Sequence, residues 1–295
     1  MLKTPLPAVV ALALLAGAMC AAPASAVPHD PIPFLPGERA REFLFAGAAF
    51  SPDGRSVYFT RYAEFTVEAL KTIMVSHRSG ALWSEPEPAP FSGQWSDTTP
   101  FVAPAGDRLY FASNRPVDGK TKEDFDLWFV DRKGEGWGEP RPVSAVNSSA
   151  NETSPSVSAD GVLYFCSWRE EGGMGLGDLW SAEPTAGGFA APRNLGAPIN
   201  GPTGEWGVTV SANGQLMVFE SSGRPEGLSG AGDLYLSRRV HGAWTPPVHL
   251  KAPINSAGSD LAPRLSADGE DLYFASTRSG RLQMWRVALP AASKR

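Results

Sequence analysis

Short runs of apolar and aromatic residues recur along the chain, each bounded by glycine-containing turns, and no helical periodicity competes with them. Five of these runs superimpose on one glycine. They are Ser51–Thr60, Ala103–Asn114, Ser158–Trp168, Ser211–Ser222 and Ser266–Thr277. The shared glycines, Gly54, Gly106, Gly161, Gly214 and Gly269, are spaced by 52, 55, 53 and 55 residues. A repeat of this length is a unit that buries its faces only against its neighbours.

Each unit contains four short stretches rich in Val, Tyr, Phe and Trp, separated by Asp-Gly, Asn-Gly or other glycine turns, and this pattern is typical of β-strands. We name them strands a to d in sequence order, with the shared glycine in the turn between a and b. Four-stranded units repeating at 40 to 55 residues are typical of β-propeller blades. The sequence therefore predicts an all-β fold, a single β-propeller with five blades.

The last unit ends after strand c at Val287-Ala288-Leu289 and lacks strand d. The segment Asp30–Gly37 resembles the strand d segment Pro86–Gly93, so we expect the N-terminal strand to complete the last blade and to close the ring. Six blades remain the alternative if the segment from Glu42 to Phe50 pairs irregularly.

The repeated motifs resemble the TolB-like (WD-like, SPDG-type) propeller repeats of exported bacterial proteins. The resemblance rests on the SPDG or SADG turn, LYFxS, an arginine, DLW or DLY, and a final NLG and IN, and it covers about residues 45–289. It implies an exported binding or scaffolding module. The chain lacks the separate N-terminal domain of TolB, so a role in the Tol system is not implied.

The N-terminal sequence and the net charge predict where the protein is found and which partners are excluded. Met1-Leu2-Lys3, an apolar run from Ala8 to Met19 and Ala24-Ser25-Ala26 predict a secretory signal peptide over residues 1–26. Residues 27–295 then form the propeller domain, in the periplasm or secreted, and lipoprotein processing at Cys20 is disfavoured because the usual preceding leucine is missing. The net charge of −5 argues against nucleic acid binding. We expect no membrane span, no cofactor, no metal and a monomer.

Two charges recur on the face formed by the longer d-to-a and b-to-c connections, which we call the loop-rich face. Acidic residues precede the shared glycine by nine positions in four blades, and an arginine follows it in all five. The acids are Asp97, Glu152, Glu205 and Asp260; the arginines are Arg61, Arg115, Arg169, Arg224 and Arg278. The acids should ring the mouth of the central channel, as a ligand site or as partners of the arginines. Because the charges recur with the repeat, we favour structural ion pairs.

Departures from the repeat are the better functional candidates. Six tryptophans occupy repeat positions and are expected in the core, whereas Trp95, Trp168 and Trp206 lie on the loop-rich face beside charged residues. Aromatic side chains amid polar groups suit a protein, peptide or glycan partner. These three residues, with the four acids, are the candidate ligand-binding set.

Catalytic motifs are not apparent. The four histidines share no register, and Cys166 stands where other blades have alanine, as a small buried residue. The hypothesis is thus a non-enzymatic binding or scaffold propeller. The competing hypothesis is an exported, carboxylate-dependent hydrolase acting on glycans through the four acids.

Overall fold

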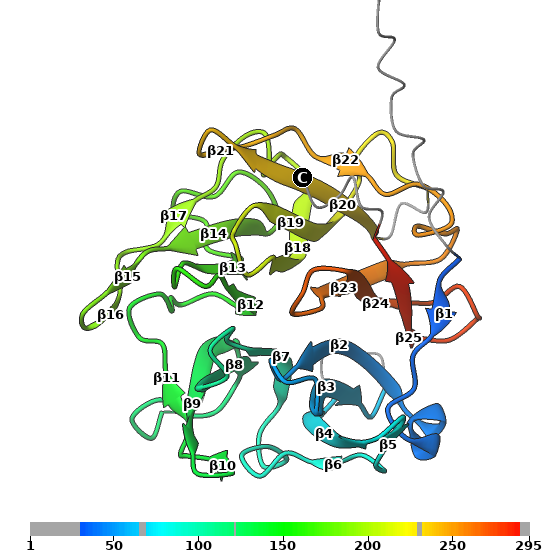
Figure 1. Cartoon of the computed structure of the whole chain (residues 1–295). Coiled ribbons are helices and arrows are strands. Elements are labelled where there is room, and N and C mark those ends of the chain that lie inside the picture. The colour runs from blue at the N-terminus through cyan, green and yellow to red at the C-terminus, as the bar shows by residue number, and fades with distance from the viewer. Residues whose placement is uncertain (1–29, 65–68, 121, 229–231, 290–295) are drawn as a thin grey trace, which may run out of the picture.

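The computed structural model describes residues 30–64, 69–120, 122–228 and 232–289. It is an all-β ring of antiparallel sheets arranged around a central axis, with a single 3-10 helix, η1 (Glu38–Glu42), at its edge (Figure 1). The predicted signal peptide and Cys20 lie outside the described residues. No helix in the described ranges is long and apolar enough to cross a membrane.

Five blades surround the axis, as predicted, and in each of them strand a is innermost. Blade 1 is β2 (Leu44–Phe50), β3 (Ser56–Tyr62), β4 (Lys71–Ser79) and β6 (Glu87–Pro88), with β5 (Leu82–Trp83) in the c–d hairpin. Blade 2 is β7 (Asp97–Val102), β8 (Arg108–Ser113), β9 (Asp126–Lys133) and β11 (Arg141–Pro142), with β10 (Gly136–Trp137).

Blade 3 is β12 (Glu152–Val157), β13 (Leu163–Ser167), β14 (Asp178–Ala182) and β17 (Arg193–Asn194). Its c–d hairpin forms a separate two-stranded sheet, β15 (Pro184–Thr185) and β16 (Gly188–Phe189), because Pro184 has no N–H to continue the ladder. Blade 4 is β18 (Gly204–Val210), β19 (Leu216–Ser222), β20 (Asp233–Val240) and β22 (Val248–His249), with β21 (Ala243–Trp244).

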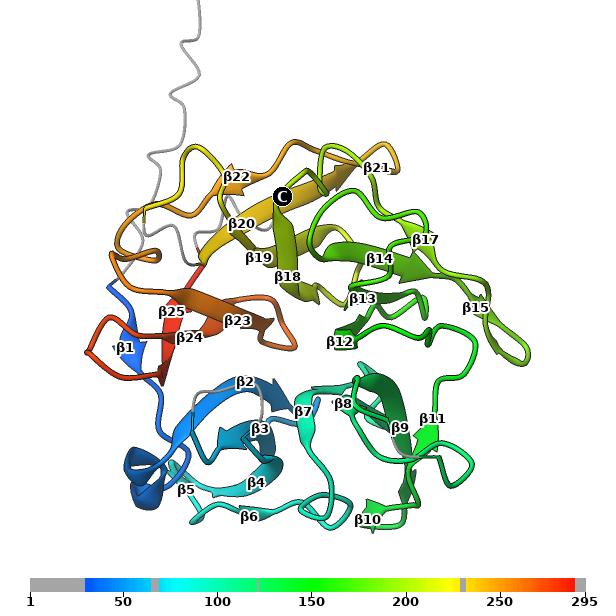
Figure 2. The same ribbon diagram turned by 180° about the vertical axis from the view of Figure 1, so that it is seen from behind.

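Blade 5 confirms the predicted closure of the ring. Strands β23 (Asp260–Leu265), β24 (Asp271–Ser276) and β25 (Gln283–Ala288) are completed by β1 (Ile32–Pro33), which pairs antiparallel with β25. The first and last strands thus meet in one sheet (Figure 2). The segment Glu42–Phe50 supplies strand a of blade 1, so the six-bladed alternative is wrong.

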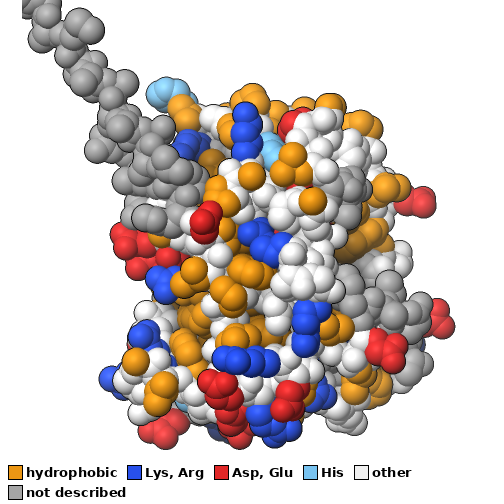
Figure 3. Space-filling view, turned by 90° about the vertical axis from the view of Figure 1, so that its right-hand side faces the viewer, with side chains coloured by type: hydrophobic (Ala, Val, Ile, Leu, Met, Phe, Trp, Pro, Cys, Tyr) orange, Lys and Arg blue, Asp and Glu red, His pale blue; other side chains and the backbone are white. Residues whose placement is uncertain are grey.

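The N-terminal segment also joins blade 5 to blade 1. The Phe34 ring packs edge-on against Tyr273 of blade 5 at 5.0 Å between centroids, and against Phe50 and Trp83 of blade 1 at 5.6 and 6.1 Å. At this side of the ring, hydrophobic side chains lie among lysines, arginines and acids (Figure 3). Phe34 therefore contributes to the hydrophobic core of both blade 5 and blade 1.

Every innermost strand carries a β-bulge at the same position. The bulged residues have left-handed backbone, with φ between 50° and 71°, and they are Gly47, Thr99, Ser154, Gly207 and Ala262. A bulge increases the local twist of a strand and bends it. The five bulges therefore shape the wall of the central channel.

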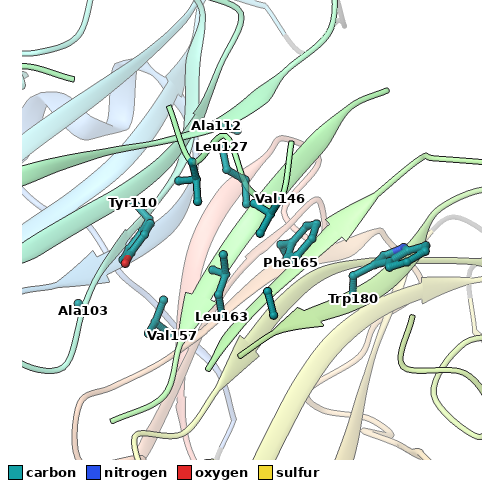
Figure 4. Packing of buried hydrophobic residues seen from close by; sticks show 11 residues of the cluster. Ala103, Tyr110, Ala112, Leu127, Val146, Val157, Leu163, Phe165 and Trp180 are labelled. Atoms are coloured by element: carbon teal, nitrogen blue, oxygen red, sulfur yellow. The ribbon is translucent and has the colours of Figure 1, made fainter. Parts of the chain in front are cut away.

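The core consists of hydrophobic clusters between adjacent blades. The cluster between blades 2 and 3 contains Tyr110, Leu127, Leu163, Phe165 and Trp180, and its side chains come from both sheets (Figure 4). At the outer end of three interfaces, a tyrosine of strand b meets an aromatic ring of the next blade: Tyr58–Trp137, Tyr110–Phe189 and Tyr164–Trp244. The repeat therefore encodes contacts between blades as well as within them.

Candidate functional site

The recurring acids and arginines form four ion pairs within the blades. An arginine Nη2 donates to a carboxylate oxygen in Asp97–Arg115 (2.7 Å), Glu152–Arg169 (3.1 Å), Glu205–Arg224 (2.9 Å) and Asp260–Arg278 (2.8 Å). All four acids have 0% exposure. The acids therefore do not line the mouth of the channel as expected, because each side chain turns toward the arginine that follows strand b of its own blade.

Each paired arginine is held on several sides. Its Nε donates to a serine hydroxyl of strand b at 2.8–3.0 Å, and its Nη2 also donates to a backbone carbonyl in the preceding blade's d-to-a connection. Its guanidinium lies between a phenylalanine of strand b and an aromatic ring of strand c, as in Arg169 with Phe165 (5.7 Å) and Trp180 (4.8 Å). The guanidinium thus connects three strands of one blade to the blade before it.

The first blade departs from this arrangement. Phe45 takes the place of the acid, and Arg61 lies over the ring of Phe43, with 5.2 Å from its Cζ to the ring centroid. Arg61 is only partly buried. Arg61 also stands earlier than the other four arginines: it pairs with Phe45 inside β3, at the register position that the other blades fill with a serine, as in the pairs Asp97–Ser113 and Glu152–Ser167. The prediction that Arg61 is equivalent to the paired arginines is therefore wrong.

The tryptophans separate into two groups. Seven of the nine pack in or against the hydrophobic clusters, and this group includes Trp206 as well as the six at repeat positions. Trp95 and Trp168 belong to none of these clusters. Trp168 is 36% exposed, and Trp95 is partly buried.

Trp95 and Trp168 line one cavity of about 830 Å³ on the loop-rich face. Trp95 lies in the connection from blade 1 to blade 2, and Trp168 directly follows β13 of blade 3. The remaining wall is formed by side chains of the first three blades: Tyr62, Leu70, Lys71, Gln94, Ser96, Thr98, Thr99, Asn114, Glu123, Phe125, Asn151 and Thr153. A concave site with aromatic walls and a few polar groups is the usual form of a ligand pocket.

Trp206 lies behind this cavity and is not part of its lining. Gly177 separates the two indoles: a Cβ atom at Gly177 would lie 2.5 Å from Nε1 of Trp206 and 3.3 Å from Cε2 of Trp168. Only glycine allows so close an approach of backbone to both rings. Gly177 therefore connects Trp206, outside the cavity, to Trp168 in its wall.

Arg264 crosses the central channel and was not among the residues predicted from the sequence. The residue is 2% exposed, and its guanidinium donates to the carbonyl oxygens of Val208 in blade 4 (3.1 Å) and Pro100 in blade 2 (3.4 Å). Burial lowers the pKa of Arg264 to about 10. Arg264 departs from its repeat position, which the other blades fill with Ala49, Phe101, Ser156 and Thr209, but only the tertiary structure shows that it joins blades 2, 4 and 5 around the axis.

Glu220 was also not predicted, although a signal for it exists. It occupies the strand b position filled by Thr60, Ala112, Cys166 and Ala275 in the other blades. Its Oε2 accepts a hydrogen bond from the backbone N–H of Ala262 (3.3 Å), the bulged residue of blade 5. Burial, and to a smaller extent the charge of Asp260, raise the pKa of Glu220 to about 7.

Groups for nucleophilic or metal chemistry are sparse. Cys166 is completely buried, its Sγ lies 3.4 Å from the carbonyl oxygen of Glu205, and burial raises the thiol pKa well above its usual value. Among the described residues, no three histidine, cysteine, aspartate or glutamate side chains are grouped so that they could hold a metal ion.

The ring of five blades defines a β-propeller, and its loop-rich face carries a concave site with aromatic walls. Solved structures of TolB share this fold: the putative TolB of Agrobacterium tumefaciens (TM-score 0.52, 19% identity, 79% of this chain and 70% of that one) and the TolB of Acinetobacter baumannii (0.52, 16%, 84% and 55%). The chain thus spans about half the length of the second. The chain has a TolB-like propeller fold, as the repeat motifs predicted.

The structure of a BT0996 complex with RGII is similar over 90% of this protein and 91% of that one, with a TM-score of 0.56 and 12% identity. No family model matches the sequence, and neither does any curated protein. The similarity is one of fold, and the function has to be inferred from the site.

Proposed function

We propose that this protein is an exported, non-enzymatic propeller that binds a protein, peptide or glycan partner through its loop-rich face. The observation that carries the proposal is the cavity of about 830 Å³ between Trp95 and Trp168. Both indoles remain outside the hydrophobic clusters that hold the other seven tryptophans. Large aromatic side chains left accessible in a concave site supply binding energy at small entropic cost.

Buried carboxylates disfavour the competing hydrolase. A glycosidase needs two carboxyl groups that reach the substrate, and the four repeat acids are inaccessible and bonded to arginine. We assign the acids and the arginines a structural role, in which they hold each blade to the preceding one. Glu152→Gln and Glu205→Gln test this role, and both variants should lose thermal stability. If the wild type hydrolyses a glycan panel and a variant that remains folded does not, the assignment is contradicted.

The binding role is tested with immobilised protein and envelope extract. Trp95→Ala and Trp168→Ala should each lose a partner that the wild type retains, whereas Leu82→Ala should keep it. Leu82 is a suitable control because it is 77% exposed and lies in a c–d hairpin, on the opposite face. Retention of every partner by both tryptophan variants would exclude this cavity as the site.

Export is supported by the N-terminal sequence, which has the features of a secretory signal peptide. We propose that the mature protein starts at Val27 and is found in the periplasm or the medium. Mass spectrometry of the protein purified from these fractions should give an N-terminal peptide starting at Val27. A peptide that starts at Met1, or a lipid-modified Cys20, would contradict this processing.

A further inference from the structure

Two side-chain amides in the cavity have a fixed orientation. Oδ1 of Asn114 accepts a hydrogen bond from the backbone N–H of Ser96, and Oδ1 of Asn151 accepts one from the backbone N–H of Phe125, both at 2.9 Å. A backbone N–H can only donate, so the atom facing it must be the amide oxygen. The two NH₂ groups are therefore left as donors, and within the described residues neither of them has a protein partner.

Each of the two asparagines is also held beside a tryptophan by a hydrogen bond between backbone groups. In blade 2 the Asn114 N–H donates to the carbonyl oxygen of Ser96, the neighbour of Trp95 (3.3 Å); in blade 3 the Trp168 N–H donates to the carbonyl oxygen of Asn151 (3.0 Å). The cavity thus contains two adjacent units, each with one indole and one NH₂ donor. Trp168 and Asn114 occupy the same repeat position, immediately before the arginine, where blades 4 and 5 have Gly223 and Thr277.

Charge in the cavity is balanced. Lys71 and Glu123 are its only charged lining residues among those described. The Lys71 ammonium donates to the carbonyl oxygen of Ala69 (3.2 Å) and lies over the ring of Phe125, with 5.4 Å to the centroid. A site with one charge of each sign favours no net charge on its ligand.

We propose that this cavity binds a neutral oligosaccharide, with consecutive sugar rings stacked on Trp95 and Trp168. The NH₂ groups of Asn114 and Asn151 donate to hydroxyl or acetamido oxygens of the glycan. The inference rests on the proposed binding function and names its ligand class.

Two observations favour a glycan over a peptide. Peptides often bind by adding a strand to an open sheet edge, but the innermost strands β7 and β12 are the edges nearest the cavity and carry bulges that break their register at Thr99 and Ser154. The electron-rich faces of two indoles suit the C–H face of a sugar ring, and donors beside them suit its oxygens. The cavity volume is within the range of small-ligand sites.

The test is isothermal titration calorimetry with cellotriose, xylotriose and chitotriose, and with trigalacturonic acid as the charged comparator. The variants are Asn114→Asp and Asn151→Asp, which keep the acceptor for the backbone N–H and replace the donor by an oxygen. Asn213→Asp is the matched control, because it adds the same charge on the a–b turn of blade 4, where three other blades have aspartate.

At least one neutral trisaccharide should bind saturably, with a Kd that changes less than about twofold between 50 and 500 mM salt. Asn114→Asp, Asn151→Asp and Trp168→Ala should each weaken it about tenfold or more, and Asn213→Asp should not. Binding of trigalacturonic acid alone, or unchanged affinity in the two Asp variants, would overturn the proposal. If no saccharide binds but the tryptophan variants lose an envelope protein, the binding function stands and the glycan class is wrong.

Discussion

The Arg115 guanidinium donates to Asp97 at 2.7 Å, and the Asp97 carboxylate is completely inaccessible to solvent. Arg115 also donates to the carbonyl oxygen of Phe91 in blade 1 (3.2 Å) and lies 4.9 Å from the ring centroid of Phe111. The same arrangement recurs in blades 3, 4 and 5. One side chain therefore neutralises a buried charge and joins two blades.

Arg115→Met should lower the free energy of unfolding by about 3–5 kcal/mol, because it leaves a buried carboxylate without a partner. Arg61→Met is the internal control, since Phe45 replaces the acid in its blade, and it should cost less than about 1.5 kcal/mol. Urea unfolding followed by tryptophan fluorescence measures both. Equal losses would show that the ring contacts, rather than the ion pair, carry the stability.

Glu220→Gln should change how stability depends on pH. The pKa of Glu220 is about 7 in the folded protein and near 4.5 when the chain is unfolded, so the unfolded chain releases its proton first. The wild type therefore loses stability as the pH rises from about 4.5 to 7. Glutamine keeps the acceptor for the Ala262 N–H and does not titrate, so it removes this loss. The free energy of unfolding of the variant, relative to that of the wild type, should therefore be about 1–3 kcal/mol higher at pH 8 than at pH 4.

Thermal unfolding at pH 4 and pH 8 measures this effect. Glu87→Gln, a change at an exposed residue of β6, is the control and should leave the pH profile as it is. A stability difference between Glu220→Gln and the wild type that is the same at pH 4 and pH 8, or that moves against the variant at pH 8, would contradict the raised pKa.

Phe34→Ala should open the closure of the ring. The ring of Phe34 contacts Tyr273 in blade 5 and Phe50 and Trp83 in blade 1, so its removal affects both blades. Because Phe34 is only partly buried, we expect a loss of about 2–3 kcal/mol, below the range for a fully buried phenylalanine. Hydrogen exchange should show faster exchange in β1 and β25, and exchange that rises equally in β7 and β8 would contradict a local closure.

Gly177→Ala should change the shape of the cavity without replacing any of its polar side chains. The added Cβ would lie 2.5 Å from Nε1 of Trp206, so the indole of Trp206 or the backbone at residue 177 must move. We expect a shift in tryptophan fluorescence and at least a fivefold loss of affinity for the cavity's ligand. Gly187→Ala is the control, since its Cβ would meet nothing within 4 Å, and it should alter neither measurement.

Much of the fold was predictable because local sequence features that recur in each blade specify it. The shared glycines, the turn residues and the alternating apolar strands each specify short-range geometry, and five copies of them leave one way to bury the faces of every sheet. The resemblance of Asp30–Gly37 to the strand d of blade 1 was enough to predict β1 beside β25. The recurrence of acids and arginines likewise pointed to structural ion pairs.

The site depended on more than the sequence could show. Trp95, Trp168 and Trp206 look alike in sequence, each predicted on the same face and beside a charge. Their burial is decided by neighbours distant in the chain. Trp206 packs against Gly177 and the cluster between blades 3 and 4, whereas Trp95 and Trp168 line a cavity formed by blades 1 to 3. Sequence position alone does not contain that distinction.

The sequence by itself determined the five blades, their strand order and the closure of the ring, because turn chemistry and apolar alternation act over a few residues. Only the tertiary structure decided that the repeat acids face inward to their arginines, that Arg264 crosses the channel, and that two tryptophans and two amides share one cavity. Those relationships join residues from different strands and blades, and they arise only when the ring is closed.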